Sequence, residues 1–514
     1  MKVLHLYLTM MIKTQCIILL QHDPVIMHTQ KFTILHSNDM HGDFLAEARG
    51  EVGCLIGGLA LLSGYVNKVR GEEENVLYVI AGDMVQGSLI DTEYRGISTI
   101  EIMNYLAPDV VSLGNHELDY GLEHLLFLEK MANFPIVNAN LYIKKYFKRL
   151  MTPHLVIKKA GLDILFIGII TEKVMDTISR DSMIGSFISI EEASREVGRI
   201  CDAYRNDDID LTVLLTHIGF DSDRELAKIL DPAWGVDMII GGHSHTILEQ
   251  PAIENNILIA QAGVGTDQIG RFDIIVDDDT NKIVDYSWHL IEISEKSAKP
   301  DLKLLEYIHS YKQDVDRKYN ALITKFTLPL THPCREQETS LGNLVSDIFR
   351  EVAECDIMLM GSGAIRSAEL GPAVTLGILR ECFPFEDSLK RFTVNGNRIK
   401  QIFAHIMRPE NRTGEGECYQ VSAGVRAVYN DRTKTLESLT LNGEPVEDAA
   451  QYTIGLIGYH VDNCTKNLDI THEELVAGGP FKTVATSTTA VLEEYLRIHP
   501  NLSRRVEGRI VYIS

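Results

Sequence analysis

The sequence lacks an excess of basic residues, a long apolar run and patterned cysteines, and each absence excludes a class of protein. Its 514 residues contain 49 Lys and Arg against 72 Asp and Glu, which gives a formal net charge of −23. Nucleic acids and anionic membranes favour basic surfaces, so we expect neither as a partner. No segment beyond the N-terminal region is long enough for a transmembrane helix, so we expect no stable membrane anchor. Eight cysteines without C-x-x-C spacing predict reduced thiols rather than disulfides or a zinc cluster.

Residues 1–30 are predicted to form an N-terminal extension ahead of the folded domains. The stretch from Met1 to Leu20 is apolar and resembles a signal peptide, but Lys13 and Gln15 interrupt it and no A-x-A cleavage site follows. A second explanation is that Met27 is the natural start, since it leads directly into the first strand. We favour this explanation, which predicts a cytoplasmic protein, whereas a signal peptide predicts a secreted or cell-surface protein.

Residues 31–295 alternate short β-branched apolar runs with helical stretches, which predicts an α/β domain. The predicted strands cover 32–38, 76–82, 110–115, 162–170, 211–217 and 237–243. A packet of polar residues follows the C-terminal end of nearly every one of these runs. Open α/β sheets bind ligands at that edge, so loops far apart in the sequence are expected to converge on one site.

The polar packets contain seven residues of the types that bind metals. They are Asp39, His41, Asp83, Asn115, His217, His243 and His245. Carboxylate and amide oxygens and neutral imidazole nitrogens hold divalent cations. Seven ligands are too many for one tetrahedral ion, but they suit two ions if one carboxylate bridges them. A pair of ions indicates hydrolysis at phosphorus above other reactions.

The segment G-N-H-E-L-D-Y-G at 114–121 contains a candidate catalytic pair, His116 and Asp119. Asp119 follows three residues after His116 and is placed to hold its ring in one tautomer and to stabilise its cationic form. This arrangement is typical of a general acid. The alternative is purely structural, with Asn115 as a helix N-cap and Asp119 as a first-turn carboxylate.

A linker helix is predicted over 296–321, followed by a second domain over 322–514. Residues 300–320 lack glycine and place apolar residues at helical spacing. These residues are Leu302, Leu305, Ile308, Tyr311, Val315 and Tyr319. Mixed α and β signals begin again at Ile323, so we expect a second α/β domain.

The ordered motifs D-x-H, G-D, G-N-H-E-x-D-x-G, T-H and G-G-H-x-H resemble those of the calcineurin-like metallophosphatases. With the large second domain, the chain resembles the 5′-nucleotidase family over about residues 32–514. The resemblance implies a four-layer αββα sandwich followed by a smaller α/β substrate-binding domain. It also implies two divalent ions (Mn, Zn, Co or similar). One would be held by Asp39, His41, Asp83 and His245, and the other by Asp83, Asn115, His217 and His243.

The resemblance assigns substrate-binding roles in the second domain to Arg335, Arg366, Phe385 and Tyr459. The arginines match positions that contact phosphate or other polar groups, and the aromatics match a pair that sandwiches a nucleobase. The chain departs from the family at Gly361, where Asn is common, and at His245, where Gln or Asn is common. After Tyr459, the sequence H-V-D-N-C-T-K-N-L-D replaces the usual N-G-G-D-G-[FY], with Asp462 as a candidate substitute for the base-contacting Asp.

The resemblance implies a dimetal phosphohydrolase that acts on nucleoside 5′-monophosphates in nucleotide catabolism. Family members also include UDP-sugar hydrolases and 2′,3′-cyclic-nucleotide phosphodiesterases, which share the metal site. A third alternative is an inactive binding protein on the same fold, but such proteins have lost ligands that are all present here. The sequence leaves the oligomeric state open.

Overall fold

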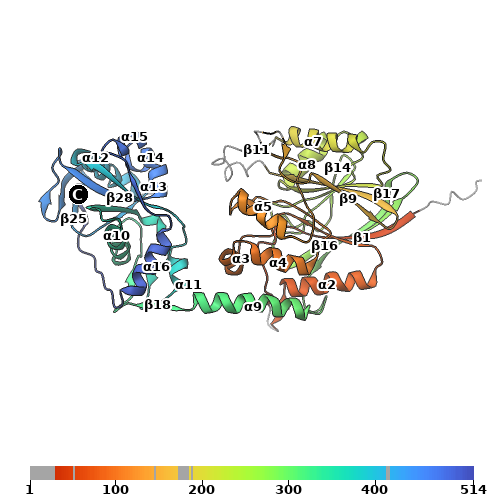
Figure 1. Cartoon of the computed structure of the whole chain (residues 1–514), viewed down its shortest axis with the longest axis horizontal. Helices are drawn as coiled ribbons and strands as arrows, with labels where there is room; N and C mark the ends of the chain where they lie inside the picture. The colour runs from red at the N-terminus through yellow and green to blue at the C-terminus, as the bar shows by residue number, and fades with distance from the viewer. Residues whose placement is uncertain are drawn as a thin grey trace, which may run out of the picture. The chain divides into compact units, whose positions relative to one another are not determined.

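A computed structural model describes residues 29–49, 53–143, 146, 148–171, 184–186, 189–412 and 417–513. The chain divides into two compact units, Met1–Val315 and Asp316–Ser514 (Figure 1). Of the predicted N-terminal extension, residues 1–28, including the candidate start at Met27, lie outside the described residues. No helix in the described part of the chain is long and apolar enough to cross a membrane.

The first unit is built on two six-stranded sheets. The first sheet has the order β17-β16-β1-β4-β5-β6, and β1, β4, β5 and β6 are parallel. Its strands are β17 (Lys282–Glu292), β16 (Gln268–Asp277), β1 (Thr29–Ser37), β4 (Val76–Ala81), β5 (Val110–Ser112) and β6 (Ile136–Val137). The second has the order β14-β15-β13-β12-β10-β9, with β10, β12, β13 and β15 parallel. Its strands are β14 (Ala252–Glu254), β15 (Ile257–Ala260), β13 (Met238–Ile240), β12 (Leu211–His217), β10 (Leu162–Ile170) and β9 (His154–Lys159).

The two sheets pack face to face, with helices on their outer sides (Figure 1). Side chains such as Phe32, Phe166 and Phe272 fill the layer between the sheets. Helices α7 (Ile190–Ala203) and α8 (Phe220–Ile229) cover the second sheet, where Val197 and Leu226 join its core. Helices α2 (Leu59–Glu72), α3 (Leu89–Tyr94), α4 (Ile97–Leu106) and α5 (Leu122–Met131) lie with the first. The expected four-layer αββα sandwich is therefore confirmed.

Small sheets of two or three short strands accompany the large sheets of both units. They are β2 (Glu47–Arg49) with β3 (Cys54–Ile56), β7 (Leu141–Ile143) with β8 (Lys148–Arg149) and β11 (Ile184–Ser186), β18 (Leu322–Lys325) with β22 (Ala373–Thr375), and β19 (Leu330–Thr331) with β21 (Glu369–Leu370).

The second unit is also α/β. A five-stranded sheet has the order β24-β20-β28-β23-β29, and a four-stranded sheet has the order β27-β26-β25-β30. The strands are β24 (Tyr419–Val421), β20 (Ile357–Gly361), β28 (Gln451–Ile457), β23 (Leu389–Asn395), β29 (Lys482–Ala485), β27 (Glu444–Pro445), β26 (Thr435–Leu441), β25 (Val425–Asn430) and β30 (Ile510–Ile513). The helices are α10 (Ser340–Ala353), α11 (Leu376–Cys382), α12 (Gly396–Ile406), α13 (Gly458–Asp462), α14 (Cys464–Leu468), α15 (His472–Val476) and α16 (Thr488–Ile498).

Helix α9 (Leu302–Tyr319) contains the boundary between the two units. Ile308, Val315 and Tyr319 are buried, in line with the apolar spacing. Leu302 is an exception, because it is 70% exposed while Leu304 is fully buried. The helix therefore turns a slightly different face inward from the one that the sequence pattern indicates.

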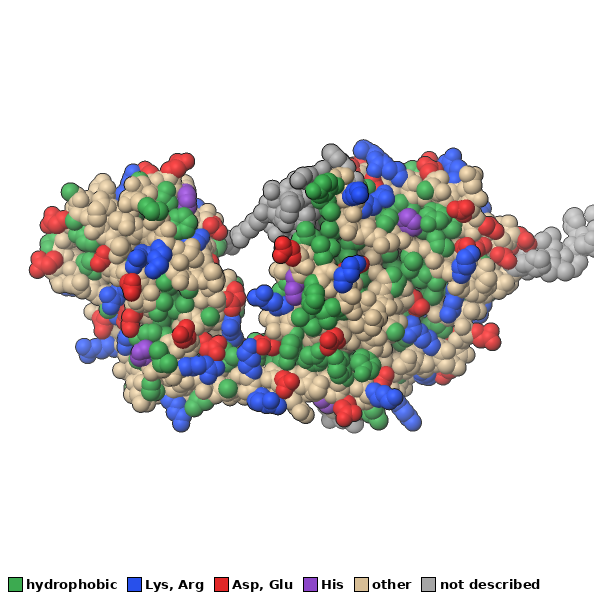
Figure 2. All heavy atoms as spheres, in the orientation of Figure 1, with side chains coloured by type: hydrophobic (Ala, Val, Ile, Leu, Met, Phe, Trp, Pro, Cys, Tyr) green, Lys and Arg blue, Asp and Glu red, His purple; other side chains and the backbone are tan. Residues whose placement is uncertain are grey.

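Charged side chains of both signs are distributed over the surface. Figure 2 shows Lys and Arg interspersed with Asp, Glu and hydrophobic side chains, and no continuous basic patch among the described residues on the visible face. This distribution agrees with the acidic composition.

Candidate metal centre and substrate pocket

The seven predicted ligands lie at the carboxyl ends of β1, β4, β5, β12 and β13, with His217 as the last residue of β12 and the others in the loops that follow, so both sheets contribute to one site. Six of them, together with His116, form three overlapping groups of His and Asp side chains. These are Asp39 with His41 and His245, Asp83 with His217 and His243, and His41 with Asp83 and His116. Within each group the ligand atoms lie within 4.8 Å of one another. The first two groups have the composition expected for two neighbouring cation sites.

The loops carry the ligands in an unusual backbone conformation. Five ligands have positive φ: Asp39 (51°), His41 (49°), Asp83 (54°), His243 (81°) and His245 (53°). Such a conformation is uncommon and costs about 1–3 kcal/mol for a non-glycine residue, so it persists only where the surroundings enforce it. Its concentration in one ligand set marks the loops as a functional site.

Close packing between the loops enforces this geometry. A Cβ at Gly114 would lie 2.1 Å from Asp83 Oδ1, and one at Gly242 would lie 2.6 Å from the Ala81 carbonyl oxygen. Only glycine permits these approaches. The glycines beside the ligands therefore allow separate loops to converge.

Two of the histidines are held in a single tautomer. His41 Nδ1 lies 3.1 Å from the Gln86 carbonyl oxygen, and His217 Nδ1 lies 2.8 Å from that of Ala81. Since a carbonyl only accepts, both Nδ1 atoms carry a proton and both Nε2 atoms are left to bind a cation. His41 Nε2 faces His245 Nε2 at 3.2 Å, which suits two ligands converging on one ion.

Buried polar atoms at the centre support the same conclusion. Asn115 Oδ1 and His217 Nε2 are buried without a hydrogen-bond partner among the residues that the structure describes. His217 Nε2 lies 3.0 Å from Asp83 Oδ2, a separation that requires a proton or a cation nearby. Burial lowers the pKa of His217, but Asp83 and Asp39 raise it to about 9, so the site attracts positive charge. The residues present therefore fit a pair of divalent cations.

Glu117 is a buried residue of the site that the sequence reasoning did not single out. Its carboxylate accepts hydrogen bonds from the backbone N–H groups of Gly114 (2.7 Å), Met84 (2.7 Å) and Asp83 (3.0 Å). It thus ties the Asn115 loop to the Asp83 loop. Its position inside G-N-H-E was the available signal, but the sequence does not reveal what it contacts.

Asn38 connects the Asp39 loop to a second loop through hydrogen bonds. Its side-chain amide donates to Asp39 Oδ2 (2.7 Å) and to the Gly263 carbonyl (2.7 Å). The backbone N–H of His243 also donates to Asp39, at 2.9 Å to Oδ2. Asp39 is thereby oriented by groups from both sheets.

His116 and Asp119 lie at the exposed edge of the cluster. His116 Nδ1 is 2.6 Å from Asp119 Oδ2, and this hydrogen bond is the main cause of the raised pKa of His116. The His116 ring lies edge-on to that of His41, with 5.3 Å between centroids. Asn115 occupies the N-cap position of the short 3₁₀ helix at His116–Leu118, as the alternative interpretation expects, but its side chain makes no capping hydrogen bond.

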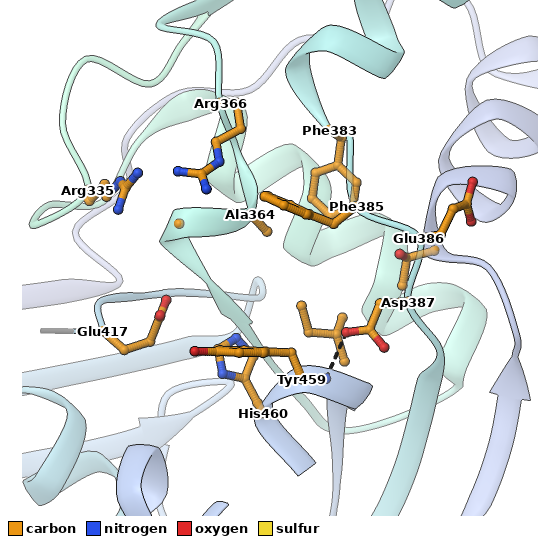
Figure 3. Close-up of a pocket in the computed structure, with 13 residues that line it drawn as sticks. Arg335, Ala364, Arg366, Phe383, Phe385, Glu386, Asp387, Glu417, Tyr459 and His460 are labelled. Carbon is orange, nitrogen blue, oxygen red and sulfur yellow. Dashed lines mark hydrogen bonds between the residues drawn. The ribbon is translucent and has the colours of Figure 1, made fainter. Parts of the chain in front are cut away.

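The four predicted substrate residues of the second unit line one pocket of about 420 Å³. Figure 3 shows Phe385 and Tyr459 on opposite sides of this pocket, with Arg335 and Arg366 at one end. Phe385 is 45% exposed and Tyr459 is 53% exposed, which is unusual for large aromatic rings. Among the described residues neither guanidinium is paired with a carboxylate, although Arg366 Cζ lies 4.9 Å from the Phe385 ring centroid.

The segment after Tyr459, where the sequence departs from the family pattern, continues helix α13 to Asp462 and then forms helix α14. Asp387 accepts a hydrogen bond from the Tyr459 N–H (2.7 Å) and fixes the start of helix α13. The residue that lines the pocket here is His460, whereas Asp462, the candidate substitute for a base-contacting Asp, does not line it. Glu417 also lines the pocket and was not singled out from the sequence.

Two family models match the chain, one in each unit. The model of the calcineurin-like phosphoesterases matches residues 32–246, and that of the 5′-nucleotidase C-terminal domain matches residues 322–468. The chain belongs to the 5′-nucleotidase family. It is accordingly a metallophosphoesterase, a hydrolase in which a calcineurin-like phosphoesterase domain precedes a 5′-nucleotidase C-terminal domain.

Relatives in the family cover most of the chain. The chain is 26% identical to the 5′-nucleotidase of Mus musculus, with 94% of this chain and 90% of that protein aligned. It is 26% identical to an apyrase of Tabanus yao, with 77% of each aligned. The crystal structure of a 5′-nucleotidase precursor from Thermus thermophilus is similar in fold, with a TM-score of 0.57, 23% identity, and 94% of this chain and 99% of that chain covered.

Proposed function

We propose that this 5′-nucleotidase-family enzyme hydrolyses nucleoside 5′-monophosphates and releases inorganic phosphate. The supporting observation is that one chain combines a ligand set suited to two cations with a pocket suited to a nucleotide. The pocket places two guanidinium groups, neither paired with a carboxylate among the described residues, beside two facing aromatic rings. Phosphate and nucleobase are the chemical groups that such side chains bind.

In this proposal, Asp39, His41, Asp83 and His245 hold one cation, and Asp83, Asn115, His217 and His243 hold the other. Two bound divalent ions supply positive charge for the transferring phosphoryl group and lower the pKa of water. The protein contributes the fixed positions of the ligands, because Glu117 and Asn38 tie their loops together.

His116 serves as a proton or hydrogen-bond donor in the reaction. Its raised pKa keeps the ring cationic to higher pH than a free histidine, with Asp119 accepting the Nδ1 proton. The remaining ring nitrogen can therefore donate to the phosphoryl group in the transition state or to the leaving oxygen.

The pocket of the second unit selects the substrate. Arg335 and Arg366 bind phosphate or other anionic oxygens with their planar donor sets. Phe385 and Tyr459 stack on the base, an interaction worth about 1–3 kcal/mol per base and tolerant of base identity. The family relationship alone does not determine the substrate, because relatives of equal identity carry the names 5′-nucleotidase and apyrase.

A panel of substrates tests the proposal. Phosphate release from AMP, UMP, UDP-glucose and 2′,3′-cyclic AMP is measured after chelation and after addition of Mn²⁺, Zn²⁺ or Co²⁺. We expect the monophosphates to be the best substrates and activity to depend on added metal. Preference for UDP-glucose or the cyclic nucleotide would reassign the reaction, and no release from any of them would refute it.

A variant separates nucleotide binding from phosphate chemistry. Tyr459→Leu should raise KM for AMP about tenfold, because one face of the base loses its stacking partner. Hydrolysis of p-nitrophenyl phosphate, which has no nucleobase or ribose, should change little. An equal loss on both substrates would argue against a base-stacking role.

A further inference from the structure

Glu417 is a carboxylate of the substrate pocket that has no ion-pair partner among the described residues. It is half-buried, lines the pocket, and accepts a hydrogen bond from the Gly363 N–H. Arg335 and Arg366 act on it electrostatically, but neither forms an ion pair with it in the described part of the chain. Figure 3 shows Glu417 between Arg335 and Tyr459. Its carboxylate is thus placed to accept hydrogen bonds from a ligand.

Gly361 makes room for this arrangement. A Cβ at position 361 would lie 2.2 Å from His460 Nε2 and 2.8 Å from Glu417 Oε1. No side chain at 361 is therefore compatible with the observed positions of His460 and Glu417. The residues at positions 361 and 460 are therefore physically coupled.

His460 lines the pocket as an uncharged side chain and does not form an ion pair with Glu417. It is 1% exposed, and its Nδ1 lies 2.9 Å from the Tyr419 hydroxyl. Burial lowers the pKa of His460 to about 4, so the ring carries no charge near neutral pH. His460 therefore does not neutralise Glu417, and the hydrogen-bonding capacity of the carboxylate stays available to a ligand.

The pocket brings together groups suited to each part of a nucleotide, with Arg335, Arg366 and Glu417 at one end and the two aromatic rings beside them. Arg366 Cζ lies 4.9 Å from the Phe385 ring centroid, and Glu417 lies across the pocket from Arg366, on the side of Tyr459. A nucleotide presents phosphate, then ribose, then base. A carboxylate accepts hydrogen bonds from both hydroxyls of a ribose diol, and acidic side chains bind ribose in this way in dinucleotide-binding folds.

We propose that Glu417 binds the 2′- and 3′-hydroxyls of the substrate ribose and makes the enzyme selective for ribonucleotides over 2′-deoxyribonucleotides. This inference rests on the proposed nucleotidase function. Removal of the 2′-hydroxyl deletes one hydrogen bond to a charged acceptor, so kcat/KM should be about tenfold or more lower for 2′-deoxy substrates.

The test compares AMP with dAMP and UMP with dUMP in the metal-loaded enzyme. The variants are Glu417→Gln and Glu417→Ala, with Glu381→Gln as a matched control, because Glu381 is exposed and does not line the pocket. The wild type and the control should prefer the ribose substrate of each pair about tenfold or more. Both Glu417 variants should bring that ratio close to one by losing activity mainly on the ribonucleotides.

A second measurement keeps the result interpretable. Hydrolysis of p-nitrophenyl phosphate reports whether each variant is folded and metal-loaded, and calorimetric titration with AMP and dAMP in the presence of chelator reports binding without turnover. An unchanged ribose-to-deoxyribose ratio in both variants, or a change in the AMP-to-UMP ratio instead, overturns the role of Glu417 alone. If the wild type neither binds nor hydrolyses any nucleotide, the proposed function itself has failed.

Discussion

His116 Nδ1 lies 2.6 Å from Asp119 Oδ2, while the His116 ring lies edge-on to that of His41. The carboxylate fixes the ring beside the metal-ligand cluster. His116→Ala should therefore lower kcat by about 10²–10⁴-fold, the usual contribution of a general acid. Metal content, measured by atomic emission, should remain that of the wild type. Stoichiometric loss of metal would show that His116 is instead a ligand.

The same hydrogen bond predicts a pH dependence. Because Asp119 raises the pKa of His116, the cationic form persists to higher pH, and activity that needs it falls only as pH rises through this raised pKa. Asp119→Asn removes the charge that stabilises the cation, so the alkaline limb should move to lower pH. The measurement is kcat/KM for AMP against pH, and an identical limb in both proteins would contradict the role.

Asp83 contributes to two of the three ligand groups and is 2% exposed. Asp83→Asn keeps an oxygen to accept the hydrogen bond from the His116 N–H (2.9 Å) but removes the negative charge. Loss of a residue that only supports a metal ligand lowers metal affinity by about 10–100-fold. Loss of a ligand's charge should lower it by at least as much. Asp285→Asn, on an exposed position of β17, is the matched control. Equal metal content in the two variants would exclude Asp83 as a ligand.

Two glycines offer a matched test of loop packing. A Cβ at Gly114 meets Asp83 Oδ1 at 2.1 Å and the Asp83 N at 2.4 Å, whereas a Cβ at Gly71 in α2 meets nothing within 4 Å. Gly114→Ala should destabilise the first unit by about 1–3 kcal/mol and weaken metal binding. Gly71→Ala should be neutral or stabilising by up to about 1 kcal/mol. Thermal unfolding of both variants decides, and similar midpoints would refute the packing argument.

His36 predicts an acid sensitivity of the fold. It is fully buried on β1 and stacks on Trp288 at 5.2 Å, and neither ring nitrogen has a hydrogen-bond partner in the described part of the chain. Burial lowers its pKa from 6.5 to about 3. Between pH 6.5 and about pH 3, His36 is protonated in the unfolded chain but neutral in the folded chain. The free energy of unfolding should therefore fall by about 1.4 kcal/mol for each pH unit of acidification in this range. His36→Leu should flatten this slope, as followed by denaturant titration at several pH values.

The local sequence predicted the strands well where the run of apolar residues was continuous. The apolar runs at 162–170 and 211–217 are β10 and β12, and the run at 32–38 lies in β1 apart from its last residue. The pattern could not assign these strands to sheets. β1 and β4 pair in one sheet and β10 and β12 in another, and periodicity of two carries no information about which strand is the neighbour.

The types and order of the candidate ligands were readable because each follows a strand end. What the sequence hides is the contact that orients them. Glu117 and Asn38 act through hydrogen bonds to backbone groups of distant loops. Such contacts leave no local sequence pattern, because a polar loop residue that makes one cannot be told from the sequence apart from a polar loop residue that does not.

By itself, the sequence determined the alternating α/β elements and the set of metal-type ligands, because strand length, apolar periodicity and ligand chemistry are local properties. Only the tertiary structure decided that two sheets supply one site, that Asp39 and Asp83 sit in a strained backbone, and that Gly361 makes room for His460 beside Glu417. These features depend on close approach between segments far apart in the chain, and packing at that scale is set by the whole fold.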